Sequence, residues 1–390
     1  RSSDLISALS LGDSLINILI EENSQLTNLS GVDNVRYIQN NLFIGSNTSL
    51  ENIDALQTLE GVGLSVSLNF NPSLTDYNGL AKLLSIGKDL TISYNSQGIA
   101  SLTGLDNLKI IGGNLELSSN YALSDISSLD NLSVINGSLK IYENPYLTSL
   151  SGLNNLNSIG GDVELNYNYS LLDLSDFNQL TKIGGNLNIE YNDQLNSLTG
   201  LELLDTINGS LSIKYNQELT DVTALGNLKA INGYIKVSGN DVLSSLTGFD
   251  HINAETISLI NITGNPMLTI CNAQSICAYL NLPNSSSTIL YNNDGCNNLD
   301  QVNEACGVGI NDNPDSEIGI YPNPAHNQLS VRSPDVMQNG VLTIFDLSGR
   351  KVLCQQIAES PVSITALNSG MFMVEIRSGS SVYRKKLIIN

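Results

Sequence analysis

Few residues of this 390-residue chain are of the types that perform acid–base, nucleophilic or metal chemistry. The two His residues, His251 and His326, have no Cys, Ser or second metal-ligand residue at a spacing that would complete a catalytic or metal site. Ser85 and Lys88 have the spacing of the S-x-x-K acylation motif, but they flank an Ile-Gly corner that recurs along the chain, which favours a solvated turn. We therefore expect no enzymatic activity, no metal and no cofactor.

The remaining candidates for chemistry are acidic. Residues 293–295 (Asn-Asp-Gly) are faintly similar to a calcium-binding loop, but the closing Glu of such a loop is missing. Glu116 and Glu164 occupy outward positions of short alternating stretches, where carboxylates usually form a hydrated face. Because no paired acids fall in an identifiable cleft, a glycan-degrading enzyme is the least favoured function class.

Acidic charge is concentrated in one part of the chain. The sequence has 17 Lys and Arg against 38 Asp and Glu, a formal net charge of −21. Residues 318–390 hold seven Lys and Arg against four Asp and Glu, so this segment carries +3 and residues 1–317 carry −24. The shift indicates a domain boundary, and the overall acidity excludes nucleic acid and anionic membranes as default partners.

An asparagine recurs every 24 residues, at the end of the pattern apolar-x-apolar-x-x-Asn, with single steps of 25 residues before Asn120 and Asn265. The alternating apolar pair predicts a short strand, and apolar residues at every third position predict extended or 3₁₀-like sides. Each unit is therefore expected to form one coil of a solenoid, with the asparagine turned inward to satisfy backbone groups in a ladder. The eleven asparagines are Asn23, Asn47, Asn71, Asn95, Asn120, Asn144, Asn168, Asn192, Asn216, Asn240 and Asn265.

The repeat unit Gly-x-Leu-x-Ile-x-x-Asn, followed by Leu at every third position and a closing Ile-x-Gly, resembles the leucine-rich-repeat fold in its receptor L-domain variety. The resemblance covers about residues 14–270. It implies a mostly β, right-handed solenoid of about eleven coils with a parallel sheet. It implies little about function, because such solenoids bind unrelated ligands.

Aromatic residues occupy the position before the ladder asparagine in five units. On adjacent coils, equivalent positions would lie about 5 Å apart. Such a stripe could stack sugar rings or a partner's apolar surface, or it could be a self-stacking ladder that stabilises neighbouring coils, which is the interpretation we favour. The residues of this stripe are Phe70, Tyr94, Tyr167, Tyr191 and Tyr215.

Four cysteines follow the last regular unit, within a segment that predicts two short helices around an irregular strand. A solenoid end exposes its core and must be closed, so two disulfides sealing a cap fit this position. Three pairings are possible, of which we favour Cys271–Cys296 and Cys277–Cys306; a zinc site is the alternative. Disulfides imply export to an oxidising compartment, and Cys354 is left over as a small strand residue.

The last part of the chain predicts a different fold. Short alternating runs separated by turn signals predict a small antiparallel β-sandwich. The runs are residues 329–331, 341–345, 351–353, 362–364, 371–376 and 383–389.

Several motifs in this last part, in order, resemble the type A C-terminal sorting domain of the type IX secretion system of Bacteroidetes. They are residues 320–325 (Ile-Tyr-Pro-Asn-Pro-Ala), 344–352 (Ile-Phe-Asp-Leu-Ser-Gly-Arg-Lys-Val), 364–370 (Ile-Thr-Ala-Leu-Asn-Ser-Gly) and 385–389 (Lys-Lys-Leu-Ile-Ile). The motif residues singled out are Tyr321, Pro322, Asn323, Pro324, Gly349, Gly370 and Lys386. The resemblance implies an export signal that an outer-membrane β-barrel shuttle and a translocon recognise, and that is normally cleaved off.

The sequence therefore predicts four segments: a solenoid (1–270), a Cys-rich cap (271–306), a linker (307–317) and a sorting β-sandwich (318–390). We expect a secreted or cell-surface binding or adhesion protein, exported across the outer membrane, whose solenoid takes an unknown protein or glycan ligand. The alternative is a structural accessory component that stays with the type IX translocon or the gliding machinery.

Overall fold

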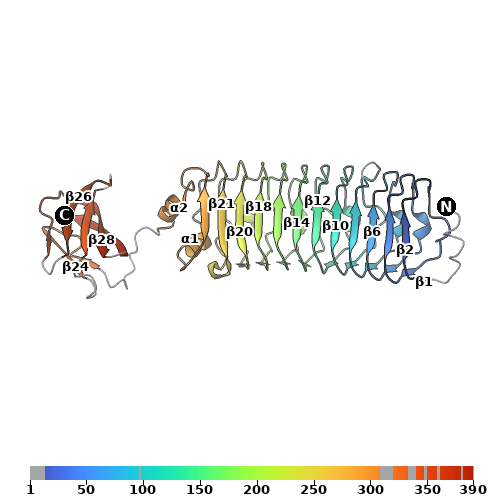
Figure 1. The fold of residues 1–390 in the computed structure, drawn as a ribbon, viewed down its shortest axis with the longest axis horizontal. Helices are drawn as coiled ribbons and strands as arrows, with labels where there is room; N and C mark the ends of the chain where they lie inside the picture. The colour runs from blue at the N-terminus through green and yellow to red at the C-terminus, as the bar shows by residue number, and fades with distance from the viewer. Residues whose placement is uncertain are drawn as a thin grey trace. The chain divides into compact units, whose positions relative to one another are not determined.

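The computed structural model describes residues 14–95, 98–307, 319–332, 340–346, 349–357, 361–378 and 381–389. The chain forms two compact units, Arg1–Val302 and Asn303–Asn390, and each is considered by itself (Figure 1). Most of the predicted linker lies outside the described residues.

The first unit is a solenoid, as the repeat predicts, and it has two parallel sheets where the sequence predicts one. The broader sheet has 12 strands in sequence order and the other has 10 strands of two residues each. The 12 strands are β2 (Ile18–Glu21), β4 (Leu42–Gly45), β6 (Val66–Asn69), β8 (Leu90–Ser93), β10 (Leu115–Ser118), β12 (Leu139–Tyr142), β14 (Val163–Asn166), β16 (Leu187–Glu190), β18 (Leu211–Lys214), β20 (Tyr234–Ser238), β21 (Leu259–Thr263) and β22 (Ser287–Leu290). The other strands are β1 (Ser14–Leu15), β3 (Tyr37–Ile38), β5 (Gly61–Val62), β7 (Ser85–Ile86), β9 (Ile110–Ile111), β11 (Val134–Ile135), β13 (Ser158–Ile159), β15 (Lys182–Ile183), β17 (Thr206–Ile207) and β19 (Ala230–Ile231).

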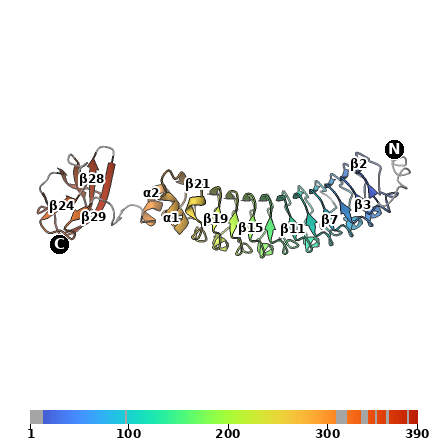
Figure 2. The same cartoon turned by 90° about the horizontal axis from the view of Figure 1, so that it is seen from below.

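Strand register places equivalent residues of successive coils side by side. Leu139 pairs with Val163, and Val163 pairs with Leu187. All three side chains are buried, and burying such a side chain stabilises the fold by about 1.5–3 kcal/mol before entropy is counted. The solenoid is curved, and the two views together place the 12-stranded sheet on its concave side (Figures 1 and 2).

The third side of the solenoid alternates between two kinds of coil. Short 3₁₀ turns form one kind, and glycines with positive φ form the other, so from residue 95 to residue 240 the structural period is two coils. The next coil contains both Gly248 and a 3₁₀ turn. A Cβ on Gly152 would lie 2.2 Å from the carbonyl oxygen of Ile126, the residue that precedes a 3₁₀ turn. Glycine is therefore required where one coil passes under the turn of the previous one. The 3₁₀ turns are η1 (Asp54–Leu56), η2 (Asn78–Leu80), η3 (Ser127–Leu129), η4 (Ser175–Phe177), η5 (Thr223–Leu225) and η6 (Ala254–Thr256).

The asparagine ladder is confirmed and is longer than the sequence period indicates. Asn168 donates its backbone N–H to the side-chain oxygen of Asn192 (3.1 Å) and its side-chain amide to the carbonyl oxygen of Ile141 (2.8 Å). The ladder extends from Asn265 to Asn292, which lies 27 residues further on. Each buried asparagine thus satisfies backbone groups that would otherwise cost about 1–3 kcal/mol each to leave unpaired.

The cap consists of α1 (Gln274–Leu280), β22 and α2 (Leu299–Ala305), with β22 continuing the broader sheet beside β21. Cys271 and Cys296 form a disulfide, which is the pairing favoured from the sequence. Cys277 and Cys306 are also disulfide-bonded, and Cys354 is a free thiol, so the second bond joins Cys277 to Cys306. α1 is bonded to the last coil, because Tyr279 donates its hydroxyl hydrogen to the carbonyl oxygen of Ser258 (3.2 Å), and the Ile276 and Tyr279 side chains are buried.

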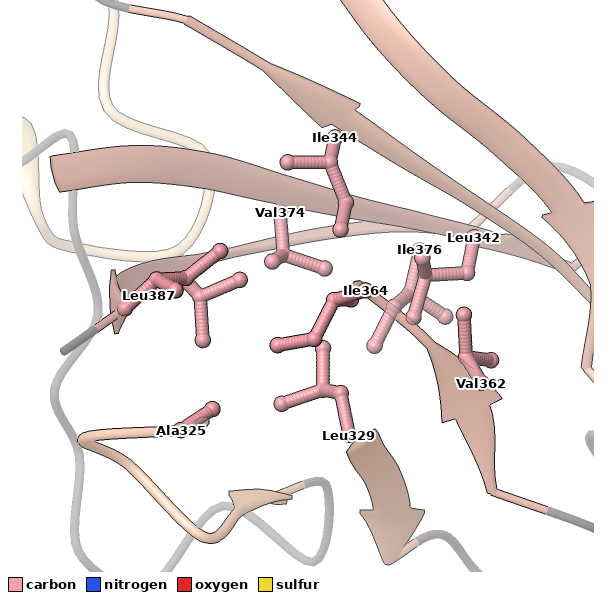
Figure 3. Close-up of a cluster of buried hydrophobic side chains, with 10 residues drawn as sticks. Ala325, Leu329, Leu342, Ile344, Val362, Ile364, Val374, Ile376 and Leu387 are labelled. Atoms are coloured by element: carbon pink, nitrogen blue, oxygen red, sulfur yellow. The ribbon is translucent and has the colours of Figure 1, made fainter. Parts of the chain in front are cut away.

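The second unit has two antiparallel sheets, as expected for a small sandwich. One has the order β23-β24-β27 and the other the order β26-β25-β28-β29. Side chains of both sheets meet in one buried cluster that includes Leu329, Ile344 and Val374 (Figure 3). The strands are β23 (Gly319–Tyr321), β24 (Gln328–Arg332), β25 (Val341–Phe345), β26 (Lys351–Gln356), β27 (Val362–Ser363), β28 (Gly370–Ser378) and β29 (Ser381–Ile389). Within the described residues of both units, no helix has the length and apolar character needed to cross a membrane.

Candidate functional sites

The aromatic stripe lies at the end of the broader sheet, at the residue that turns each coil inward. All five stripe residues have left-handed backbone, with φ of 54° to 59°. This conformation costs about 1–2 kcal/mol for a residue other than glycine. It is required here because the chain must leave the strand and point the next residue, the ladder asparagine, into the core.

The rings of the stripe stack on one another in two groups. Phe70 and Tyr94 have ring centroids 4.4 Å apart, and Tyr191 lies 4.6 Å from both Tyr167 and Tyr215. The outer face of the Tyr215 ring is covered by Gly239, where a Cβ would lie 2.5 Å from the ring. Since most ring faces contact another ring or backbone, the stripe has the contacts of a self-stacking ladder, and a ligand would reach mainly ring edges and hydroxyl groups.

The outward side chains of the strands from β12 to β18 make polar contacts across the concave face. Lys140 on β12 forms an ion pair with Glu164 on β14 (3.1 Å), and Lys214 on β18 forms one with Glu190 on β16 (2.8 Å). These ion pairs join β12 to β14 and β16 to β18. Glu116 and Glu164, expected on a hydrated face, thus lie on this face and take part in its contacts.

Tyr142 and Asn166 lie next to each other in the centre of this face, on β12 and β14. Tyr142 donates its hydroxyl hydrogen to the carboxylate of Glu116 (2.9 Å), and burial raises the pKa of this hydroxyl, an effect to which Glu116 adds. The side-chain oxygen of Asn166 is buried and has no hydrogen-bond partner among the described residues. Such acceptors are rare in folded proteins, so this oxygen is an exception within the polar face.

Three further tyrosines, which the sequence analysis did not single out, lie beside the stripe. They follow the ladder asparagine by one or two residues in three consecutive coils, and their side chains are 44–63% exposed. They could have been found by comparing these positions across the repeats, because the other described coils have no aromatic residue there. The three residues, named here the rim tyrosines, are Tyr121, Tyr146 and Tyr169.

The residues considered for chemistry are not brought together. His251 shares a hydrogen bond with the carbonyl oxygen of Gly226 (2.7 Å), and His326 is exposed in the other unit. Ser85 is part of β7, at the corner expected from the repeat. The Asp294 carboxylate accepts a hydrogen bond from Gln301 (2.7 Å) as part of the cap. Among the residues the structure describes, no group of three or more His, Cys, Asp or Glu side chains could hold a metal ion.

In the second unit, the Tyr-Pro-Asn-Pro-Ala motif is bonded to the last strand. Asn323 donates its side-chain amide to the carbonyl oxygen of Lys386 (2.7 Å) and accepts from the backbone N–H of Ile388 (2.8 Å). Ala325 N–H adds a bond to the carbonyl oxygen of Ile388 (2.7 Å). The peptide bonds before Pro322 and Pro324 are cis. The first and last motifs of this unit, 63 residues apart, therefore form one structural element.

The two motif glycines lie at a turn and at a strand end, and β28 carries a buried carboxylate. Gly349 has φ of 78° in the turn between β25 and β26, and Gly370 begins β28 with φ of 155°. On β28, Glu375 is 5% exposed and forms ion pairs with Arg377 (2.6 Å) and Arg384 (2.9 Å). Hydrogen bonds from Arg377 and then Arg384 lower the pKa of this carboxyl, which keeps it charged.

Comparison with family models finds a match within each unit. Residues 319–390 match the model of the secretion system C-terminal sorting domain. The chain carries a type IX sorting domain. This sorting domain marks the protein for export by type IX secretion, so it is a secreted or surface protein. Residues 109–180 of the solenoid match the model of the Receptor L domain. No curated protein matches the chain.

Proposed function

We propose that the solenoid is an extracellular binding module, which the sorting domain delivers to the cell surface or the medium. The observation that carries this proposal is the group of rim tyrosines, Tyr121, Tyr146 and Tyr169, which are exposed on three consecutive coils next to the concave 12-stranded sheet (Figures 1 and 2). Exposed aromatic side chains grouped on neighbouring coils offer apolar contact area that the fold of the chain does not use.

The sorting domain supplies a different kind of recognition. We propose that the outer-membrane β-barrel shuttle and the translocon recognise the element in which Asn323 joins the first motif to β29. The bonds of Asn323 to both Lys386 and Ile388 support this proposal, because they make the exposed Tyr321 and the basic end of β29 parts of one surface. The formal charge of this segment, opposite to that of the solenoid, also favours separate partners for the two units.

The experiment is a pull-down of the full chain from intact producing cells, with the Asn323→Ala chain as comparison and Asn327→Ala as its matched control. The binding-module proposal expects free or surface-attached protein, in stoichiometric excess over barrel and translocon subunits. It also expects Asn323→Ala to stay inside the cell while Asn327→Ala is exported. Recovery of the wild-type chain in a stable complex with translocon subunits would instead support the accessory-component function, and export of Asn323→Ala would remove the proposed recognition element.

A further inference from the structure

We propose that the rim tyrosines form a binding site for a neutral polysaccharide. This inference rests on the proposed binding function and names its ligand class. It also places the contact with the ligand on the surface beside the stacked stripe, whereas the sequence suggested the stripe itself.

The exposed ring faces of the rim are the first argument. The rings of Tyr167, Tyr191 and Tyr215 cover one another, whereas Tyr169 meets Tyr167 edge-on, with centroids 6.4 Å apart and planes at 78°. Within the described part of the chain, no ring stacks on Tyr121 or Tyr146. The rim thus has aromatic faces available for contact, and the apolar C–H face of a pyranose ring can pack against such a face.

The spacing of the rim is the second argument. Tyr121 and Tyr169 hold the same position in coils that are two steps apart, with Pro145 in the coil between them. Coils of parallel strands are about 4.8 Å apart, so these two residues are separated by about 10 Å along the solenoid. Two sugar rings of an extended glycan span about this length, so alternate sugars of a chain running along the solenoid would each meet one tyrosine.

The hydrogen-bonding groups beside the rim are the third argument. The carboxylate of Glu143, one coil before Tyr167, accepts a bond from Ser119 (2.7 Å) and has further lone pairs. Asp193 lies near the Tyr169 hydroxyl, whose pKa is raised first by burial and then by this carboxylate. Acceptors of this kind need hydroxyl donors, which every neutral sugar carries.

Charge selects a neutral glycan rather than an anionic one. The two lysines of the central face, Lys140 and Lys214, are each paired with a glutamate on the adjacent strand. A uronate or sulfate group would have to displace these carboxylates and approach a unit of strong negative charge. A neutral glycan would neither displace these carboxylates nor be repelled by the negative charge.

The test is affinity gel electrophoresis of the full chain in gels that contain laminarin, galactomannan, xyloglucan or xylan, with alginate and chondroitin sulfate as anionic probes. We expect at least one neutral polysaccharide to retard the wild-type protein. The double variant Tyr121→Ser/Tyr169→Ser should then bind about tenfold more weakly, as expected for removal of aromatic anchors. Tyr291→Ser, a change of a 78% exposed tyrosine outside the rim, should not alter binding.

Circular dichroism melting of each variant separates loss of binding from loss of folding. The rim variants should melt within about 1 °C of the wild type, because substitutions of exposed side chains change stability little. Retardation only by the anionic probes, or by none, would overturn the inference, as would equal retardation of the double variant. If the protein fails on every glycan but still binds cells in a protease-sensitive manner, the binding function stands and its ligand is a protein.

Discussion

The solenoid and the sorting domain hold their structure together in opposite ways. In the solenoid, stabilising contacts repeat every 24 residues, as when Asn144 bonds to Asn168 and Asn168 bonds to Asn192. In the sorting domain, the defining bonds join Asn323 to Lys386 and Ile388 across most of the unit. Repetition produces a long surface on which a few coils can differ and bind, whereas distant contacts produce one surface that exists only when the domain is complete.

The largest effect we expect is from Gly152→Ala in the solenoid. Gly152 has φ of 108°, and a Cβ would meet the backbone of the previous coil. Left-handed strain and the steric clash should together lower the free energy of unfolding by about 3–5 kcal/mol. Urea denaturation followed by circular dichroism would measure this. Gly226→Ala is the matched control, because Gly226 has φ of −63° and its Cβ would meet only one atom, at 3.1 Å. Equal stability of the two variants would disprove the requirement for glycine between coils.

Asn168→Ala should have the next largest effect. It removes the partner of the Asn144 backbone N–H and of the Ile141 carbonyl oxygen, both buried, and should lower the free energy of unfolding by about 2–3 kcal/mol. The melting of the sorting domain should not change, since the ladder contacts only neighbouring coils. Scanning calorimetry of the full chain would measure both. A loss below about 0.5 kcal/mol would show that water replaces the ladder.

Tyr191→Ser tests the stacked stripe and should cost about 1 kcal/mol, since Tyr191 stacks on rings on both sides. Tyr291→Ser is the comparison, because Tyr291 has the same left-handed backbone, with φ of 60°, and no stacked ring among the described residues. The difference between the melting temperatures of the two variants measures the contribution of ring stacking to stability. If Tyr191→Ser leaves stability unchanged but weakens polysaccharide binding, the stripe itself is part of the site.

The smallest effect concerns pH and the sorting domain. The folded-state pKa of Glu375 lies below its ordinary value of 4.5, because Arg377 and Arg384 stabilise the charged form. Its contribution to stability is therefore complete above that ordinary value and is lost as the pH falls through the folded-state pKa. Urea titrations between pH 3 and pH 6 should show this loss in the sorting domain, and Glu375→Gln should flatten it. A wild-type curve that is flat over this range would disprove the coupling.

The fold of the solenoid was predictable because the same sequence pattern recurs eleven times along the chain. The irregular features were not predictable from a period of 24 residues: the alternation of glycine and 3₁₀ coils has twice that period, and Asn292 breaks the spacing of the ladder. The rim tyrosines were missed because they lie two or three residues past the stripe position and occur in three coils only. That Asn166 is unpaired follows from the orientation of neighbouring side chains, for which sequence spacing carries no signal.

The central claim is that the sorting domain delivers the solenoid to the outside, where the solenoid acts alone. The most direct test is antibody labelling of the solenoid on intact producing cells and in their medium. It compares cells that make the full chain with cells that make a chain ending at Gly307. The account predicts that the full chain places the solenoid on the surface or in the medium, while the shorter chain is made in equal amount and stays inside. External solenoid in equal amount from the shorter chain would contradict it.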